Sequence, residues 1–120
     1  MKKTLVLGAS PNPARYSYAA VQQLRDNDHE VVAVGTRKGL IGDVHIQLET
    51  PEVEGVDTVT LYLNPRRQEQ YYEYILDIIA PKRIIFNPGT ENGELMRKAR
   101  EKGIETLPAC TLVMLSLGSY

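Results

Sequence analysis

Several residue types are scarce in this sequence of 120 residues, and each scarcity excludes a class of protein. A single cysteine cannot form an internal disulfide, which indicates a reducing compartment. No apolar run approaches the roughly 18 residues of a membrane span, and the apolar stretch near the N-terminus is too short for a signal peptide. We therefore expect a cytoplasmic protein that does not contact a membrane.

The sequence also has no large excess of positive or negative charge, because its formal net charge is only −1. A chain this close to neutrality has no overall field that would hold nucleic acid or an anionic surface. We therefore expect no nucleic-acid partner. Any contact with an anionic ligand must come from a local group of basic side chains.

Residues that ligate metals or transfer protons are few. The two histidines and one cysteine show no recognised metal-site spacing. His29 precedes a predicted strand, and His45 falls in an irregular segment, so neither is placed as a base. Cys110 is expected to be a small buried apolar residue rather than a reactive thiolate. The sequence therefore predicts no metal site and no catalytic group.

Short β-favouring runs that alternate with helical segments make up most of the chain. Strands are expected at 4–7, 30–34, 57–63, 83–86 and 104–107, and helices at about 17–27, 64–79, 92–102 and 111–117. Residues 39–56 are the least regular part, with Val44 and Ile46 in a short extended piece. This alternation predicts one α/β domain over residues 1–120, a three-layer, doubly wound Rossmann-like fold. Its five-stranded parallel sheet is expected in the order 3-2-1-4-5.

Ligands of such sheets bind beyond the carboxyl ends of the strands, where the strand order reverses. The expected order places that point between the first and fourth strands. The loop 8–17 follows the first strand and starts a helix, an arrangement that binds phosphate. Gly8 is the sole glycine of a dinucleotide fingerprint there, while Ser10, Arg15 and Ser17 offer phosphate donors.

The residues of the turn after the second predicted strand indicate which kind of nucleotide the site would suit. An NAD site needs an acidic residue there, but this turn reads Gly35-Thr36-Arg37-Lys38-Gly39. Two cations suit a ribose that carries a phosphate, as in NADP or coenzyme A (CoA). A solvated basic turn is the alternative.

Two further loops are expected to contribute. After the fourth strand, Asn87 and Gly89 are expected to line the site, whereas Glu91 could equally favour a helix start. Arg66 and Arg67 are either anion contacts or exposed side chains, and Tyr62 is a candidate to lie beneath an adenine. The ligand-binding residues expected in total are Gly8, Ala9, Ser10, Arg15, Tyr16, Ser17, Gly35, Thr36, Arg37, Lys38, Leu63, Asn64, Pro65, Asn87, Pro88 and Gly89.

These motifs resemble those of the small single-domain bacterial CoA-binding proteins, whose Rossmann-like fold is shared with the α subunit of succinyl-CoA synthetase. The resemblance covers nearly the whole chain. The residues that carry it are 8–13 with Arg15 and Ser17, Val34-Gly35 with Lys38, Asn64-Pro65, 87–91 and 109–111.

The resemblance implies a place for each part of CoA. The diphosphate would lie at Ser10, Arg15 and Ser17, the phosphorylated ribose at Thr36, Arg37 and Lys38, and the adenine at Leu63, Asn64 and Pro65. Where the family commonly has Val-Asn-Pro after the second strand, this chain has Val34-Gly35-Thr36. The ligase partner domain is missing, so acyl-CoA synthesis is not implied.

The expected function is therefore to bind CoA or a short acyl-CoA without chemistry of its own, to sense it or to present it to a partner. An NADP-linked oxidoreductase domain is one alternative, against which the missing motif glycines count. A scaffold with a vestigial pocket, which dimerises through its tyrosine-bearing helix, is the other.

Overall fold

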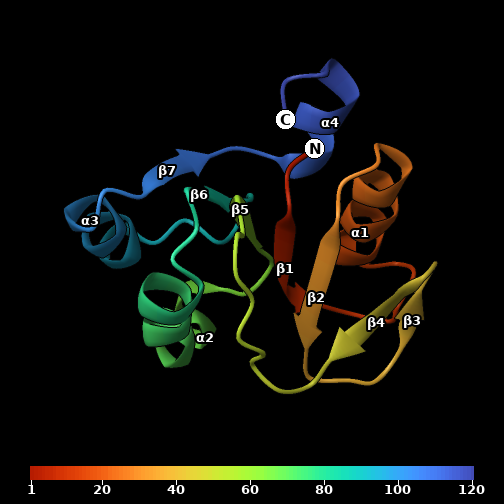
Figure 1. Cartoon of the computed structure of the whole chain (residues 1–120), viewed down its shortest axis with the longest axis horizontal. Helices are drawn as coiled ribbons and strands as arrows, with labels where there is room; N and C mark the ends of the chain where they lie inside the picture. Colours follow the sequence, from red (N-terminus) through yellow and green to blue (C-terminus); the bar gives the residue numbers. More distant parts are fainter.

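The computed structural model describes residues 1–120 and shows strands alternating with helices (Figure 1). The sheet has seven strands in the order β3-β4-β2-β1-β5-β6-β7, all parallel except β3, which runs antiparallel to β4. The strands are β1 (Thr4–Ala9), β2 (Val31–Gly35), β3 (Leu40–Ile41), β4 (Val44–Gln47), β5 (Thr58–Leu61), β6 (Arg83–Phe86) and β7 (Glu105–Pro108). The α-helices are α1 (Tyr16–Asp26), α2 (Pro65–Gln68), α3 (Gly93–Glu101) and α4 (Thr111–Leu117).

The predicted α/β class is confirmed, but the five-stranded sheet in the order 3-2-1-4-5 is wrong. The segment 39–56 supplies two more strands, a hairpin that turns at Gly42 with φ +60. β4 buries Val44 and Ile46 and exposes the residues between and after them, the alternation of a half-buried strand. It takes the place beside β2 that the prediction gave to the strand at 57–63.

The strand predicted at 57–63 is β5, and it pairs with β1 instead. Thr4 lies opposite Thr58, and Leu7 lies opposite Leu61. The strand order therefore reverses between β1 and β5, not between β1 and β6. This places the carboxyl end of β5 directly beside the bend that leads into α1.

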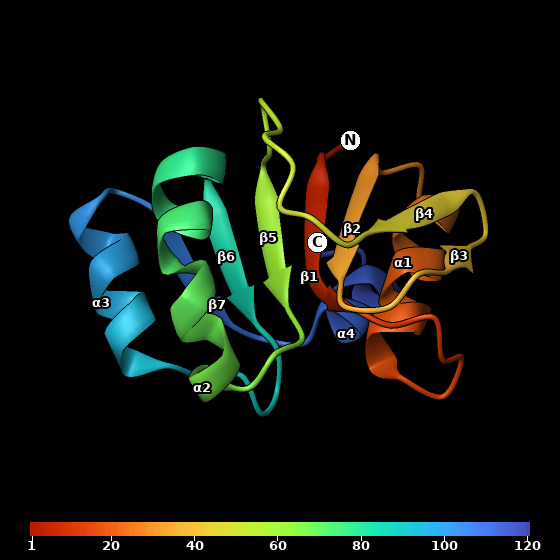
Figure 2. The same ribbon diagram turned by 90° about the horizontal axis from the view of Figure 1, so that it is seen from below.

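Helices cover both faces of the sheet (Figure 2). Alternate side chains of β1 point to opposite faces, as the pleat requires. Leu5 and Leu7 join a core with Ile75 and Leu95 from the side of α2 and α3, whereas Val6 joins a second core with residues of α1. The continuous apolar run of β1 is thus explained by burial on both sides.

The helix predicted at 64–79 is present but changes its winding along its length. It starts as α2, tightens to a 3₁₀ turn η1 (Glu69–Tyr71), and ends as a π-helix η2 (Tyr74–Ile79). The predicted cap is confirmed, because the Asn64 side chain accepts a hydrogen bond from the Arg67 amide at 2.9 Å. The helix ends at Ala80, with φ +45, immediately before Pro81.

The last helix, α4, spans the predicted residues 111–117 and lies beside α1, with both chain termini nearby (Figure 1). Thr111 fixes its start, since its hydroxyl lies 2.8 Å from that of Thr60 on β5. None of the helices combines the length and the apolar character that crossing a membrane requires.

Candidate functional site

A pocket of about 740 Å³ opens at the carboxyl ends of β1, β2, β5 and β6, the edge at which the strand order reverses. Four loops form its walls, and thirteen of the sixteen residues expected to bind a ligand line it. The lining residues are Gly8, Ala9, Ser10, Pro11, Asn12, Arg15, Tyr16, Ser17, Val34, Gly35, Thr36, Arg37, Tyr62, Leu63, Asn64, Arg67, Gln70, Tyr71, Pro88, Gly89 and Thr90.

The floor of the pocket is made where strand ends approach closely. Gly8 has φ +96, and a Cβ there would lie 2.9 Å from the carbonyl carbon of Tyr62. A Cβ on Gly35 would lie 2.1 Å from the carbonyl oxygen of Ala9. Only glycine permits this approach of neighbouring backbones. The two glycines therefore allow the ends of β1, β2 and β5 to lie close together beneath the pocket.

The bend after β1 uses most of its own backbone amides. The Ser10 amide donates to Ser17 Oγ at 3.2 Å, and the Asn12 amide donates to Ser10 Oγ at 3.1 Å. The Ala14 amide donates to Asn12 Oδ1 at 3.0 Å, and the Arg15 amide donates to the Asn12 carbonyl at 3.0 Å. These four amides shape the bend.

The amides that remain free lie at the start of α1. The N–H groups of Tyr16 and Ser17 have no acceptor within the chain, and Arg15 at the N-cap position provides no side-chain cap. The first turn of α1 also contains no acidic residue. Free amides at a helix N-terminus favour an anion. The start of α1 is therefore the part of this loop that has free backbone donors.

The charge of the pocket wall is entirely positive. Arg15, Arg37 and Arg67 line it, and no aspartate or glutamate does. None of the three arginines forms an ion pair with a carboxylate or donates a side-chain hydrogen bond within the chain. In a chain of net charge −1 this is a local concentration of unpaired cations. Such a wall is complementary to a ligand that carries several negative charges.

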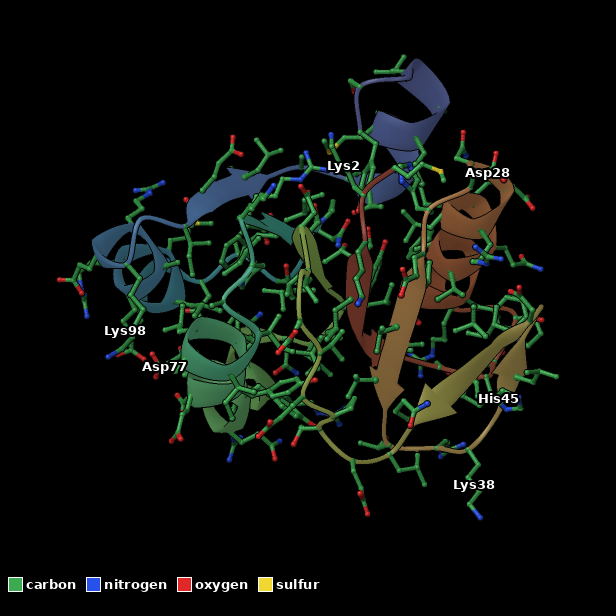
Figure 3. The ribbon with its side chains drawn as sticks, in the orientation of Figure 1. Lys2, Asp28, Lys38, His45, Asp77 and Lys98 are labelled. Atoms are coloured by element: carbon green, nitrogen blue, oxygen red, sulfur yellow. The ribbon has the colours of Figure 1, made fainter.

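Three of the expected residues lie outside the pocket lining. Lys38 extends away from the body of the protein (Figure 3). Pro65 begins α2 and leaves the lining to Asn64 and Arg67. Asn87 lies buried below the pocket, where its amide nitrogen donates to Thr60 Oγ1 at 2.6 Å and its oxygen accepts from the Thr111 amide at 2.8 Å.

The loop after β6 contributes Pro88, Gly89 and Thr90. Its Gly89 amide donates to Glu91 Oε1 at 2.8 Å, so that amide is already occupied. Glu91 itself is outside the lining, and its carboxylate stabilises the loop by accepting this hydrogen bond. This loop therefore supplies shape to the pocket rather than charge.

Gln70 and Tyr71 also line the pocket, and neither was among the residues expected to bind a ligand. They follow Arg67 by three and four residues, a spacing that places side chains on one face of a helix. Once Arg67 is placed in the wall, the spacing identifies both. The preceding Asn64-Pro65 start of the helix was the available signal.

Gln68 was not predicted from the sequence to have a role at the site, and it fixes the pocket wall formed by α2. Its side chain is fully buried, and its amide nitrogen donates to the carbonyl oxygens of Leu63 and Thr90, both at 2.8 Å. Its oxygen accepts from the Asn92 side chain at 2.9 Å. Gln68 thus joins the start of α2 to the loop after β6, on both sides of the pocket.

The pocket lacks a group suited to proton transfer near neutral pH. The Tyr62 hydroxyl is buried without a hydrogen-bond partner, and this burial raises its pKa well above the ordinary value. Cys110 is half-buried at the start of α4 and is not part of the lining. No group of three or more His, Cys, Asp or Glu side chains is placed to hold a metal ion. The charged side chains of the lining are therefore arginines alone.

Comparison with solved structures shows how widely this architecture occurs. A crystal structure of an uncharacterized protein is 53% identical, with a TM-score of 0.96 over 100% of this chain and 98% of that chain. A hypothetical protein from Pyrococcus horikoshii OT3 is 22% identical, with a TM-score of 0.80 over 97% of this chain and 82% of that one. A protein from Thermus thermophilus is 20% identical, with a TM-score of 0.85 over 99% and 90%. The last two show similarity of fold alone.

Comparison with protein families is more specific, although a search of curated proteins finds no match. The family model described as a CoA binding domain matches residues 2–116. That range contains every residue of the pocket and all seven strands of the sheet. The chain therefore belongs to the CoA binding domain family.

Proposed function

We propose that this protein binds CoA or a short acyl-CoA in the pocket at the carboxyl ends of the strands, as a non-catalytic cytoplasmic binding or sensing module. The observation that carries the proposal is the wall of three unpaired arginines around the free amides of α1, with no acidic residue. CoA carries a diphosphate and a ribose phosphate, and several anionic groups of this kind match such a wall. The family match supports the same ligand.

The diphosphate is assigned to the start of α1. The amides of Tyr16 and Ser17 point their free N–H groups there, and the Arg15 side chain is available beside them. The Ser17 hydroxyl accepts from the Ser10 amide and keeps its own proton free to donate. Charge-assisted hydrogen bonds of this type are about twice as strong as neutral ones.

The strand order supports one orientation of CoA in the pocket over the other. Arg37 follows β2, whereas Leu63 and Asn64 follow β5, on the opposite side of β1. The resemblance to the CoA-binding proteins implied the ribose phosphate at Arg37 and the adenine at Leu63, which lie on opposite sides of β1. Because one ribose carries both groups, we now place adenine beside Thr36 and Arg37. The pantetheine arm then runs toward Leu63 and the loop after β6.

Calorimetric titration with CoA, dephospho-CoA, NADP and NAD tests this function. The proposal predicts that CoA binds most tightly and that dephospho-CoA, without the ribose phosphate, binds more weakly. A preference for NADP would support the oxidoreductase alternative. If none of the four ligands binds, the scaffold alternative stands and the proposal is wrong.

The Arg37→Gln variant tests the orientation. Losing one charged hydrogen bond should weaken CoA binding by about 1.5–3 kcal/mol, and dephospho-CoA binding should be unchanged. Lys38→Gln is the matched control, since Lys38 carries the same charge on the same turn but lies outside the pocket. Equal losses for both ligands in Arg37→Gln would contradict the assignment.

A further inference from the structure

We infer that Arg67 binds the diphosphate from the side opposite α1, so that the site clamps a diphosphate between two cationic walls. The inference rests on the proposed function and extends it to a residue on the α2 wall. Arg67 and Arg66 are neighbours in α2 and both are exposed, but only Arg67 lines the pocket. The chain therefore contains a cation aimed at the ligand and an adjacent cation that is not.

The sheet brings the start of α2 beside the start of α1. β5 pairs with β1, and a Cβ on Gly8 in β1 would lie 2.9 Å from the carbonyl carbon of Tyr62 and 3.0 Å from the side chain of Leu63. α2 begins two residues after Leu63. Arg37, in contrast, follows β2 on the other side of β1. The bend after β1 therefore has one arginine on each flank, with Arg15 in the middle.

The backbone of Arg67 is fixed while its side chain is free. The Arg67 amide donates to Asn64 Oδ1 at 2.9 Å, and the next residue, Gln68, ties the helix to the carbonyl oxygens of Leu63 and Thr90. The guanidinium forms no ion pair with a carboxylate and donates no hydrogen bond within the chain. A cation that is held at a pocket wall and is not already neutralised is ready to bind an anion.

The diphosphate is the anionic part of CoA that lies nearest to Arg67. The ribose phosphate belongs to the Arg37 side, and the pantetheine arm on the α2 side is uncharged. The amides of α1 approach the diphosphate from one side only, which leaves oxygens of its two phosphates open toward α2. A guanidinium fork matches two such oxygens at once. Gln70 and Tyr71, farther along the same face, are left for the uncharged arm.

Calorimetric titration of Arg67→Gln with CoA and with dephospho-CoA tests the inference. The dissociation constant should rise about 10- to 100-fold for both ligands, the effect of losing a charged hydrogen bond. Arg66→Gln removes the same charge one residue away and should change either constant by less than about 2-fold, because an exposed charge outside the pocket acts weakly. Thermal melting should show both variants folded.

Three results would overturn the inference. The first is an Arg67→Gln loss no larger than that of Arg66→Gln. The second is a loss with CoA that disappears with dephospho-CoA, which would assign Arg67 to the ribose phosphate. If Arg67→Gln does not fold, Arg67→Ala replaces it, and wild-type affinity in that variant would be the third. Failure of the wild-type protein to bind CoA, read from the same titration, would instead refute the proposed function.

Discussion

Arginine side chains have opposite environments at the two ends of the sheet. At the amino end, Arg83 is nine-tenths buried, its Nε donates to Thr58 Oγ1 at 2.7 Å, and its guanidinium lies 4.5 Å from the ring centre of Tyr120. Its Nε is also 3.9 Å from a carboxylate oxygen of Asp57. At the carboxyl end, the arginines that line the pocket have no partner within the chain.

This difference distinguishes an arginine that is paired within the fold from arginines that remain unpaired at the pocket wall. A buried charge is costly unless it is paired, so the amino end covers Arg83 with an aromatic ring, a hydroxyl and a carboxylate. An unpaired arginine in a solvated pocket has little desolvation cost, because water still contacts its guanidinium. Its interaction energy increases when an anion binds beside it. Composition cannot separate the two kinds of arginine. Position in the sheet does.

The largest effect on stability is expected from a residue of the carboxyl end that belongs to the fold. Gln68→Ala removes three hydrogen bonds, two of them buried, which should lower the free energy of unfolding by about 3 kcal/mol. Gln70→Ala is the control, because Gln70 is exposed in the pocket wall and should change stability by less than about 0.5 kcal/mol. Urea unfolding measures both. Equal effects would mean that the α2 wall is not fixed through Gln68.

The next prediction compares one arginine at each end of the sheet, by its effects on stability and on CoA binding. Arg83→Met should lower the free energy of unfolding by about 2 kcal/mol and leave CoA affinity unchanged. The loss is limited, because one nitrogen of Arg83, Nη2, is buried without a partner in the native protein. Arg15→Gln should do the reverse, weakening CoA binding by about 1–3 kcal/mol with little change in unfolding. Urea unfolding and calorimetry measure both properties for each variant. A variant that lowered both stability and CoA affinity would contradict the distinction between the two ends of the sheet.

The smallest effect concerns His29, near the amino end of the sheet. Burial, reinforced by the N-terminal amine, Lys2 and Arg83, lowers the pKa of His29 below its ordinary value of 6.5, against a weaker effect of Asp28. Its neutral Nδ1 accepts the Lys2 amide at 2.9 Å. The unfolded chain therefore takes up a proton first as pH falls, and the stability present above pH 6.5 is lost as pH falls through the folded pKa.

The measurement for His29 is the urea midpoint at several pH values. Between pH 7.5 and 5.5 the wild-type midpoint should fall more than that of His29→Gln, whose amide can still accept from Lys2. Carboxylates titrate in both proteins and cancel in the difference. Identical slopes would show that His29 does not contribute to the pH dependence.

Local patterns predicted the elements well, because strong signals were local. The apolar run of β1, the Asn64-Pro65 start of α2 and the helix at 111–117 are all confirmed. The predicted sheet order was wrong because it depends on β4, a strand of four residues. The extended piece at Val44 and Ile46 was recognised, but it was too short to be counted as a strand of the sheet. The change of winding after Gln68 depends on tertiary contacts that no helical pattern encodes.

For the site, the loops were predictable and the individual donors were not. Parallel strands must bring their carboxyl ends to one edge, so residues of the loops after β1, β2, β5 and β6 meet in the pocket. Which amides remain free depends on hydrogen bonds within the bend, such as that from the Ser10 amide to Ser17 Oγ. Asn87 looked like a ligand contact, but Thr60 and Thr111 occupy its polar atoms.

A titration of ¹⁵N-labelled protein with CoA, followed by amide chemical shifts, shows which loops contact the ligand. If CoA binds at the carboxyl ends of the strands, the largest shifts should occur at the Tyr16 and Ser17 amides, with further shifts at Thr36 and Arg37 and none around His29 and Arg83. Shifts confined to the amino end of the sheet, or no shifts at saturating CoA, would contradict binding at this site.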